Sequence, residues 1–76
     1  MELQAPRRND PRVGNLGSNL RAARKKRGWT QEDLAGRSGV HAGEISRMEA
    51  GKRDPQVSTV EKLAAALEMP PGQLLE

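Results

Sequence analysis

The chain has 76 residues, a formal net charge of +3, one Trp, one His and no Cys, Phe or Tyr. A chain this short supports a single domain with a small aliphatic core, because it hides only about 60% of the surface that its unfolded form exposes. The missing Cys excludes disulfides, a thiol nucleophile and thiolate metal sites, and the lone His excludes a multi-histidine metal site, so no metal or other cofactor is expected.

The N-terminal part of the chain is basic. Residues 1–28 carry eight Arg or Lys against two acids, whereas residues 29–76 carry five against eight. This distribution suits a polyanionic partner. Residues 1–14 contain two Pro and no apolar period, so we expect a flexible basic arm there, followed by one domain at residues 15–76.

Five short helices are predicted and no strand-like alternation occurs, so the fold class is an all-α bundle. We expect the first helix to begin at an Asn15 cap and to end at Gly28. Between these residues, Leu16, Leu20 and Ala23 recur at helical spacing.

The second predicted helix has a clear start. Thr30 can cap it, and Asp33 stands three residues on, where a capping-box acid belongs. Trp29 and Leu34 occupy the two hydrophobic-staple positions, and the helix runs out at Gly39. Because this helix has only about eight residues, it must be held by packing against its neighbours.

A third helix follows almost at once. Val40 and Ile45 stand at staple positions around His41, an unusual residue for a cap, and Gly51 ends the helix. The short link around Gly39 forces a steep crossing, which is the geometry of a helix-turn-helix. Gly39 can take the positive φ that such a turn needs.

The last two predicted helices close the bundle. Gln56 and Ser58 compete as caps of the fourth helix, and Pro71 suits the first position of a final turn. Leu74 and Leu75 then return towards the core. The apolar stripe of the fourth helix is expected at Val60, Leu63, Ala64 and Leu67.

The faces of the third helix follow from a rotation of 100° per residue. With Ile45 at the centre of the core face, Met48 and His41 lie near it, and Glu49 lies only about 40° away. The opposite side holds Gly43, Ser46, Arg47 and Ala50. A side with so little bulk can lie deep in a groove about 12 Å wide, although Gly43 and Ala50 could equally be ordinary surface residues.

Five cations occur between Arg21 and Arg27. With Leu20 at the centre of the core face, Arg24 lies about 40° away and Arg27 closer still. A charge beside either core face is costly alone, so we predict a bidentate Arg24–Glu49 pair that joins the first and third helices. Arg27 has a long stem and can reach solvent. The cations that point outward are Arg21, Lys25 and Lys26. We interpret them as a solvated face, and contact with DNA is the alternative for the two lysines.

Several motifs in one stretch point to a known family. RGWTQEDLAGRSGVHAGEISRMEAGKRDPQVSTVEKLAAALEMPPGQLL resembles the phage-repressor and Cro-like helix-turn-helix family, often called the Xre family. The resemblance runs from about Leu16 to Leu75 and rests on RG-x-TQE-x-LA, SGV, IS-R-x-E-x-GKR and TVEKLAAAL. It implies a lambda-repressor-like fold and a transcriptional regulator that binds double-stranded DNA sequence-specifically, with the helix at about residues 41–50 in the major groove.

The resemblance also implies roles for individual positions. Gln31, aided by its helix N-terminus, matches a phosphate-binding position, and Arg24 and Glu49 match an internal ion pair. The full set of implied phosphate contacts is Thr30, Gln31, His41, Lys52 and Arg53. The positions implied to face base edges are Ala42, Gly43, Glu44, Ser46 and Arg47.

Two of these positions depart from the family pattern. Relatives often carry Gln, Arg or Ser at positions 42 and 43, whereas Ala42 and Gly43 offer only methyl contact, backbone or close approach. Direct readout therefore relies on Arg47, whose best target is guanine O6 and N7. Glu44 either reads a cytosine amino group or serves only as a cap. His41 either contacts DNA or has a capping or packing role.

Some members of this family also suggest roles for residues near the two ends of the chain. Arg7, Arg8 and Arg12 either form an arm that enters the minor groove or add only general attraction. One copy offers a single long base-reading side chain, so we expect a homodimer whose third helices lie about 34 Å apart on a pseudo-palindromic site. Leu74 and Leu75 are candidates for the dimer contact, or they simply complete the core.

Other classes of function are less well supported. A module of the same fold that binds another protein, such as an antitoxin-like regulator, is the alternative, but the outer face of the third helix lacks the aromatic anchors that such interfaces favour. An enzyme is not expected, since nothing arranges Ser, His and acids around a pocket. No apolar run approaches the roughly 18 residues of a membrane span, so the expected location is the cytoplasm, in association with the nucleoid.

Overall fold

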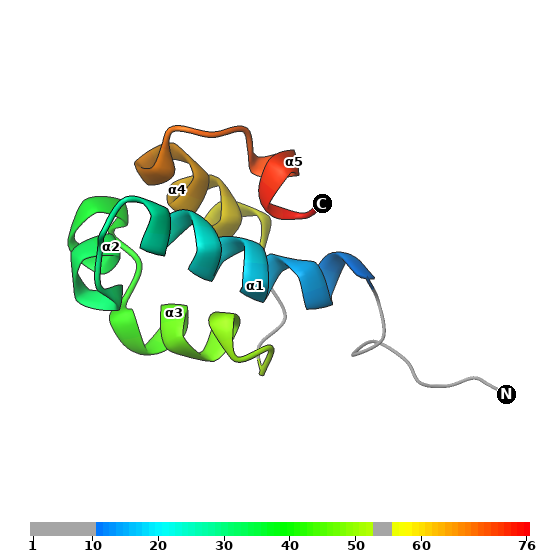
Figure 1. Ribbon diagram of the computed structural model, residues 1–76, viewed down its shortest axis with the longest axis horizontal. Helices are drawn as coiled ribbons and strands as arrows, with labels where there is room; N and C mark the ends of the chain where they lie inside the picture. Colours follow the sequence, from blue (N-terminus) through cyan, green and yellow to red (C-terminus); the bar gives the residue numbers. More distant parts are fainter. Residues whose placement is uncertain (1–10, 53–55) are drawn as a thin grey trace, which may run out of the picture.

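The computed structural model describes the backbone of residues 11–52 and 56–76, and the side chains in these ranges from residue 16 onward. Its described residues form five helices and no strand, as predicted: α1 (Pro11–Lys26), α2 (Gln31–Ser38), α3 (Ala42–Glu49), α4 (Val57–Leu67) and α5 (Pro71–Leu74). In Figure 1, α1 crosses the middle of the molecule, with α3 on one side and α4 and α5 on the other. α1 packs against α3 and α5, and α2 packs against α3 and α4.

α1 begins earlier than the sequence pattern predicts. The expected start at Asn15 is wrong, because the helix already includes Pro11. Pro suits the first position of a helix, since its φ is fixed near the helical value and it has no N–H to leave unsatisfied. Residues 11–14 of the predicted arm therefore belong to α1. Residues 1–10, with Arg7 and Arg8, lie outside the described residues, as does the side chain of Arg12.

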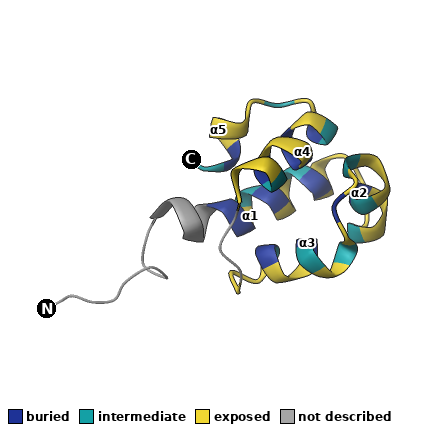
Figure 2. Cartoon of the chain, turned by 180° about the vertical axis from the view of Figure 1, so that it is seen from behind, coloured by how far each residue is buried: buried dark blue, intermediate teal, exposed yellow. Residues whose placement is uncertain are grey.

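The core is one aliphatic cluster to which every helix contributes. Figure 2 shows the buried residues on the sides of the helices that face one another. The predicted stripe of α4 is confirmed, since all four of its residues are buried. Leu74 has no exposed surface, so its candidate role in a dimer contact is wrong, whereas Leu75 is half-buried. The buried hydrophobic residues are Leu16, Leu20, Leu34, Val40, Ile45, Met48, Val60, Leu63, Ala64, Leu67 and Leu74.

The start of α2 has the predicted capping box. Thr30 Oγ1 accepts a hydrogen bond from the Asp33 backbone N–H at 3.0 Å, and Asp33 Oδ2 accepts one from the Thr30 N–H at 2.9 Å. The bonds from the Thr30 backbone and hydroxyl lower the pKa of the Asp33 carboxyl. Leu34 is buried and Trp29 packs partly against the core, as staple residues should. Gly39 ends the helix with φ 81°, the left-handed conformation predicted for the turn into α3.

The caps of α3 and α4 differ from this one. His41 stands at the cap position of α3, but its side chain makes no cap hydrogen bond and is exposed. His41 is therefore the cap residue by its backbone alone, and the alternative of a side-chain capping or packing role is wrong. Gln56, rather than Ser58, occupies the cap position of α4, again without a side-chain bond.

Gly17 marks a close approach that the sequence pattern did not reveal. It is buried in α1, and a Cβ added there would lie 2.6 Å from the carbonyl oxygen of Met48 and 2.9 Å from that of Glu49. The backbone of α1 therefore lies directly against the C-terminal end of α3, and only a residue without a side chain fits between them.

We expect Gly17→Ala to lower the free energy of unfolding. The methyl group would push against backbone atoms, which cannot rotate away, and such overpacking costs about 1–3 kcal/mol. Gly36→Ala is the matched control, because this helical Gly of α2 has open space at its Cβ position. The control should gain up to about 1 kcal/mol from helix propensity alone. Thermal melts followed by circular dichroism compare the two, and equal melting temperatures would contradict the close contact.

Candidate nucleic-acid interface

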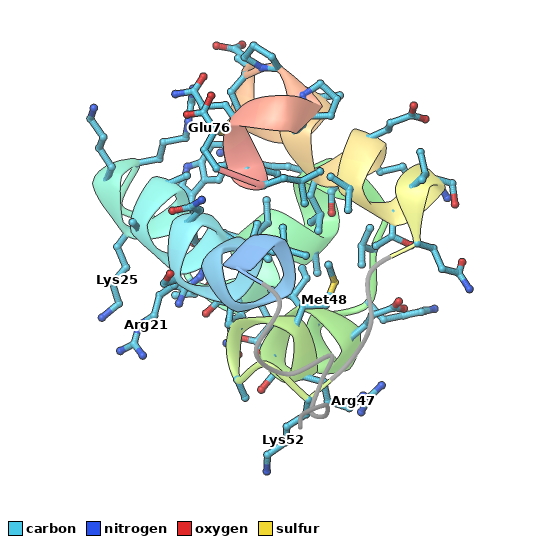
Figure 3. All side chains as sticks on the ribbon, turned by 90° about the vertical axis from the view of Figure 1, so that its right-hand side faces the viewer. Arg21, Lys25, Arg47, Met48, Lys52 and Glu76 are labelled. Carbon is cyan, nitrogen blue, oxygen red and sulfur yellow. The ribbon has the colours of Figure 1, made fainter. Side chains whose placement is uncertain are left out.

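The outer face of α3 is exposed and has little side-chain bulk. Ile45 and Met48 are buried, which confirms the predicted core face. In Figure 3, Met48 points into the molecule and Arg47 points away from it. The predicted outward residues Gly43, Ser46, Arg47 and Ala50 are all exposed. This face can therefore approach a flat or grooved surface closely along its length.

The remaining base-facing candidates stand at the N-terminal end of α3. Ala42 and Glu44 are half-buried, and His41 precedes them with an exposed side chain. Of these three residues, only His41 is exposed.

The predicted phosphate-binding residues come from the start of α2, the residue before α3 and the loop after α3. Thr30 is exposed at the start of α2, and Gln31, the first residue of that helix, is half-buried. The first N–H groups of a helix have no intrahelical partner and favour an anion. Lys52 follows α3 and extends from the same side of the molecule as Arg47 in Figure 3. Arg53 lies outside the described residues.

A buried ion pair fastens α3 to α1, as predicted. Arg24 Nε donates to Glu49 Oε2 at 2.8 Å, and Arg24 Nη2 donates to Glu49 Oε1 at 2.9 Å. The two side chains are 9% and 6% exposed, so little water reaches either charged group. The same two groups hold the start of α2: Arg24 Nη1 donates to the Trp29 carbonyl at 2.8 Å, and Gln31 Nε2 donates to Glu49 Oε1 at 3.1 Å.

These contacts keep both members of the pair charged. Burial raises the pKa of Glu49, but hydrogen bonds from Arg24 and Gln31, with the positive charges of Arg24 and Arg21, outweigh it and leave the pKa below its usual value. The hydrogen bond to Glu49 raises the pKa of Arg24. The guanidinium and the carboxylate are therefore both ionised at neutral pH.

Two contacts around Trp29 were not predicted. The Arg37 guanidinium carbon lies 4.4 Å from the centroid of the Trp29 ring, and that of Arg27 lies 5.3 Å away. Arg27 is exposed, as its long stem allows, but its Nη2 also donates to the Leu67 carbonyl and lies 3.8 Å from Glu68 Oε1. The ring and the two cations therefore tie α1, α2 and the end of α4 together.

The described part of the chain carries little that suggests another kind of site. No group of three or more His, Cys, Asp or Glu residues among the described ones could hold a metal ion. None of the helices in residues 11–52 and 56–76 is long and apolar enough to cross a bilayer. A hollow between α1 and the α4–α5 connection is lined without Ser or His, on a different side of α1 from α3.

The geometry agrees with comparisons to known proteins. A helix-turn-helix family model matches residues 20–74. The chain is 49% identical over 57 residues to the HTH-type transcriptional repressor RghR of Bacillus subtilis, an alignment that covers 74% of this chain and 42% of RghR. The chain spans less than half the length of such curated relatives.

Two solved structures are similar to the whole arrangement of helices. The restriction-modification controller protein C.AhdI from Aeromonas hydrophila has a TM-score of 0.77 and 35% identity, covering 83% of this chain and 94% of that chain. The hypothetical transcription factor NHTF from Neisseria has a TM-score of 0.81 and 34% identity, covering 100% of this chain and 86% of that chain.

Removal of either member of the ion pair should destabilise the fold. We expect Arg24→Ala and Glu49→Ala each to lower the free energy of unfolding by about 3–5 kcal/mol, because each leaves a buried charge without its partner. Lys25→Ala removes an exposed cation from the same helix and should change it by no more than about 0.5 kcal/mol. Urea denaturation measures all three, and wild-type stability in both pair variants would show that the pair does not hold the helices.

The lowered pKa of Glu49 predicts a pH dependence of stability. As the pH falls below the usual Glu value of about 4.3, the unfolded state takes up a proton before the folded state does, so the free energy of unfolding decreases. Glu49→Gln cannot titrate, and its free energy of unfolding should fall less steeply between about pH 4.5 and about pH 3. Glu61→Gln, at an exposed position of α4, is the control. Parallel pH profiles for wild type and Glu49→Gln would disprove the assignment.

Proposed function

We propose that this chain binds double-stranded DNA with the outer face of α3 in the major groove. The chain belongs to the helix-turn-helix family, whose model matches residues 20–74. The observation that carries the proposal is the exposure of Gly43, Ser46 and Arg47 opposite the buried Ile45 and Met48. An α-helix fits the major groove, which is about 12 Å wide, and a helix with small outer residues can lie deepest in it. Such binding supports a role in transcriptional regulation.

Arg47 is the principal base-reading side chain in this proposal. Its planar guanidinium can donate two parallel hydrogen bonds to O6 and N7 of a guanine. Ser46 can donate or accept at a base edge, and Ala42 offers a methyl group to thymine. Gly43 makes no side-chain hydrogen bond, but it lets the backbone of α3 approach the base edges closely. Glu44, half-buried at the start of α3, is suited to a cytosine amino group.

The phosphate contacts flank this reading face. The N-terminus of α2, with Thr30 and Gln31, is suited to one strand, and Lys52 is suited to the backbone beside the end of α3. His41 is exposed where a further phosphate could lie. Arg53 and the cations of residues 1–10 would add to the same electrostatic attraction.

Tight selective binding is expected from two copies of the chain. A dimer would place its two α3 helices about 34 Å apart, in successive major grooves of a pseudo-palindromic site. Of the two predicted contact residues, only the half-buried Leu75 retains surface for a partner. Binding to genomic DNA also supports the expected association with the nucleoid.

The proposal predicts separable effects of two exposed cations. Selection of bound sequences from random duplex DNA should recover paired half-sites, and Arg47→Ala should lower the preference at one base pair of each half-site by about 5- to 150-fold. Lys52→Ala should instead weaken all sequences alike. Because a dimer loses one phosphate contact in each copy, the slope of log affinity against log salt should become shallower by roughly 1.8.

Lys62→Ala, at an exposed position of α4 away from α3, is the control for the loss of one positive charge. If wild-type affinity showed no dependence on salt, DNA would not be the partner and a protein partner would become the better candidate. If Arg47→Ala kept the wild-type preference, Arg47 would not be the reading residue.

A further inference from the structure

The Arg47 side chain lies back over Gly43, one helical turn earlier in α3. A Cβ placed on Gly43 would lie 3.7 Å from Arg47 Nη1 and 3.9 Å from Arg47 Nη2. The two residues are four positions apart and therefore neighbours on one helix face. Both are exposed, so nothing in the core forces this arrangement.

The missing side chain of Gly43 makes the arrangement possible. Long side chains in a helix point back towards its N-terminus, so the guanidinium of Arg47 is directed at position 43. The two distances are ordinary van der Waals contacts, so a methyl group would still fit beside the guanidinium. A longer side chain at position 43 would extend into the space that the guanidinium now occupies.

The direction of the Arg47 side chain matters because of where Arg47 stands. Recognition helices of this type contact base edges mainly with their N-terminal residues. Arg47 belongs to the C-terminal half of α3, which spans Ala42–Glu49. By lying over Gly43, it carries its donor groups to the N-terminal half, where the approach to the bases is closest.

We infer that Gly43 is a specificity-determining residue that acts through Arg47. Gly43 leaves open the path along which Arg47 directs its paired N–H donors at a guanine in the major groove. This inference rests on the proposed DNA binding and deepens it, since it assigns a selective role to a residue with no side chain. Two separate positions of α3 then act as one reading unit.

A double-mutant cycle in the sequence selection tests the inference. Gly43→Leu should lower the preference for the guanine by about 5- to 150-fold, as Arg47→Ala does, because it displaces the guanidinium. Gly43→Ala should lower it much less. In the Arg47→Ala background, Gly43→Leu should cause no further loss of preference, since the residue through which it acts is gone.

Gly36→Leu makes the same substitution on the exposed face of α2 and controls for added bulk and helix propensity. Thermal melts show that each variant is folded. A wild type that binds no duplex DNA would refute the proposed function itself. If wild type and Arg47→Ala differ as expected but Gly43→Leu keeps the guanine preference, the inference alone is refuted. Some general weakening by Gly43→Leu is expected from added bulk in the groove. If that weakening were the same for all sequences, with the guanine preference kept in the Arg47 background, obstruction alone would explain it and the inference would be overturned.

Discussion

The arrangement of this domain depends on one buried contact, the bidentate pair between Arg24 and Glu49. A buried ion pair adds little net stability compared with apolar packing, because both charges lose their hydration. Its effect is instead on the geometry: if α3 slid or rotated against α1, two charges would remain buried without partners. The close approach of Gly17 to the carbonyls of Met48 and Glu49 acts at the same end of α3. The helix is thus held through both a side chain and its backbone.

The same pair connects the two parts of the proposed DNA-binding surface. Arg24 also donates to the Trp29 carbonyl, and Glu49 also accepts from Gln31, so the start of α2 and the end of α3 share one support. A phosphate held at the start of α2 and a base read from α3 would then keep a constant separation. A set of binding residues needs rigid support of this kind, because small errors in their positions break hydrogen bonds to the ligand. The Gln31 amide is part of this support as well as a candidate phosphate contact.

Much of the fold was predictable from the sequence, and the features that were missed share a physical cause. The capping box at Thr30 and the α4 stripe depend on residues within one or two turns, so local spacing reveals them. The Arg24–Glu49 pair links distant positions, yet each charge sits beside a core face and that conflict is visible in the sequence. By contrast, the role of Gly17 depends on the distance between two helix backbones, which no local pattern encodes.

The predictions that were wrong also concern features that local sequence patterns do not decide. Asn15 is a good cap residue, but Pro11 can begin the helix earlier, and propensity alone does not decide between two acceptable starts. The rotation of 100° per residue placed His41 near the core face of α3. The residue instead precedes the helix in an extended conformation, with ψ 142°, and its side chain is exposed. Leu74 had two possible destinations, the core and a dimer contact, and only the packing of α5 against α1 and α4 separates them.

The low bulk of α3 limits how selectivity can arise. One good arginine–guanine contact supplies about 1–3 kcal/mol of discrimination, whereas specific sites are typically preferred over non-specific DNA by about 4–10 kcal/mol. Two copies of Arg47 in a dimer would reach only the lower part of that range. The remainder would come from the proposed contacts of Ser46 and Glu44, and from positions that Gly43 and Ala42 approach without hydrogen bonding, where the shape and deformability of the DNA are read as energy. α3, with small outer residues and the single directed side chain of Arg47, is suited to reading DNA shape. Because its backbone would lie close to the groove, binding would depend on the width of that groove.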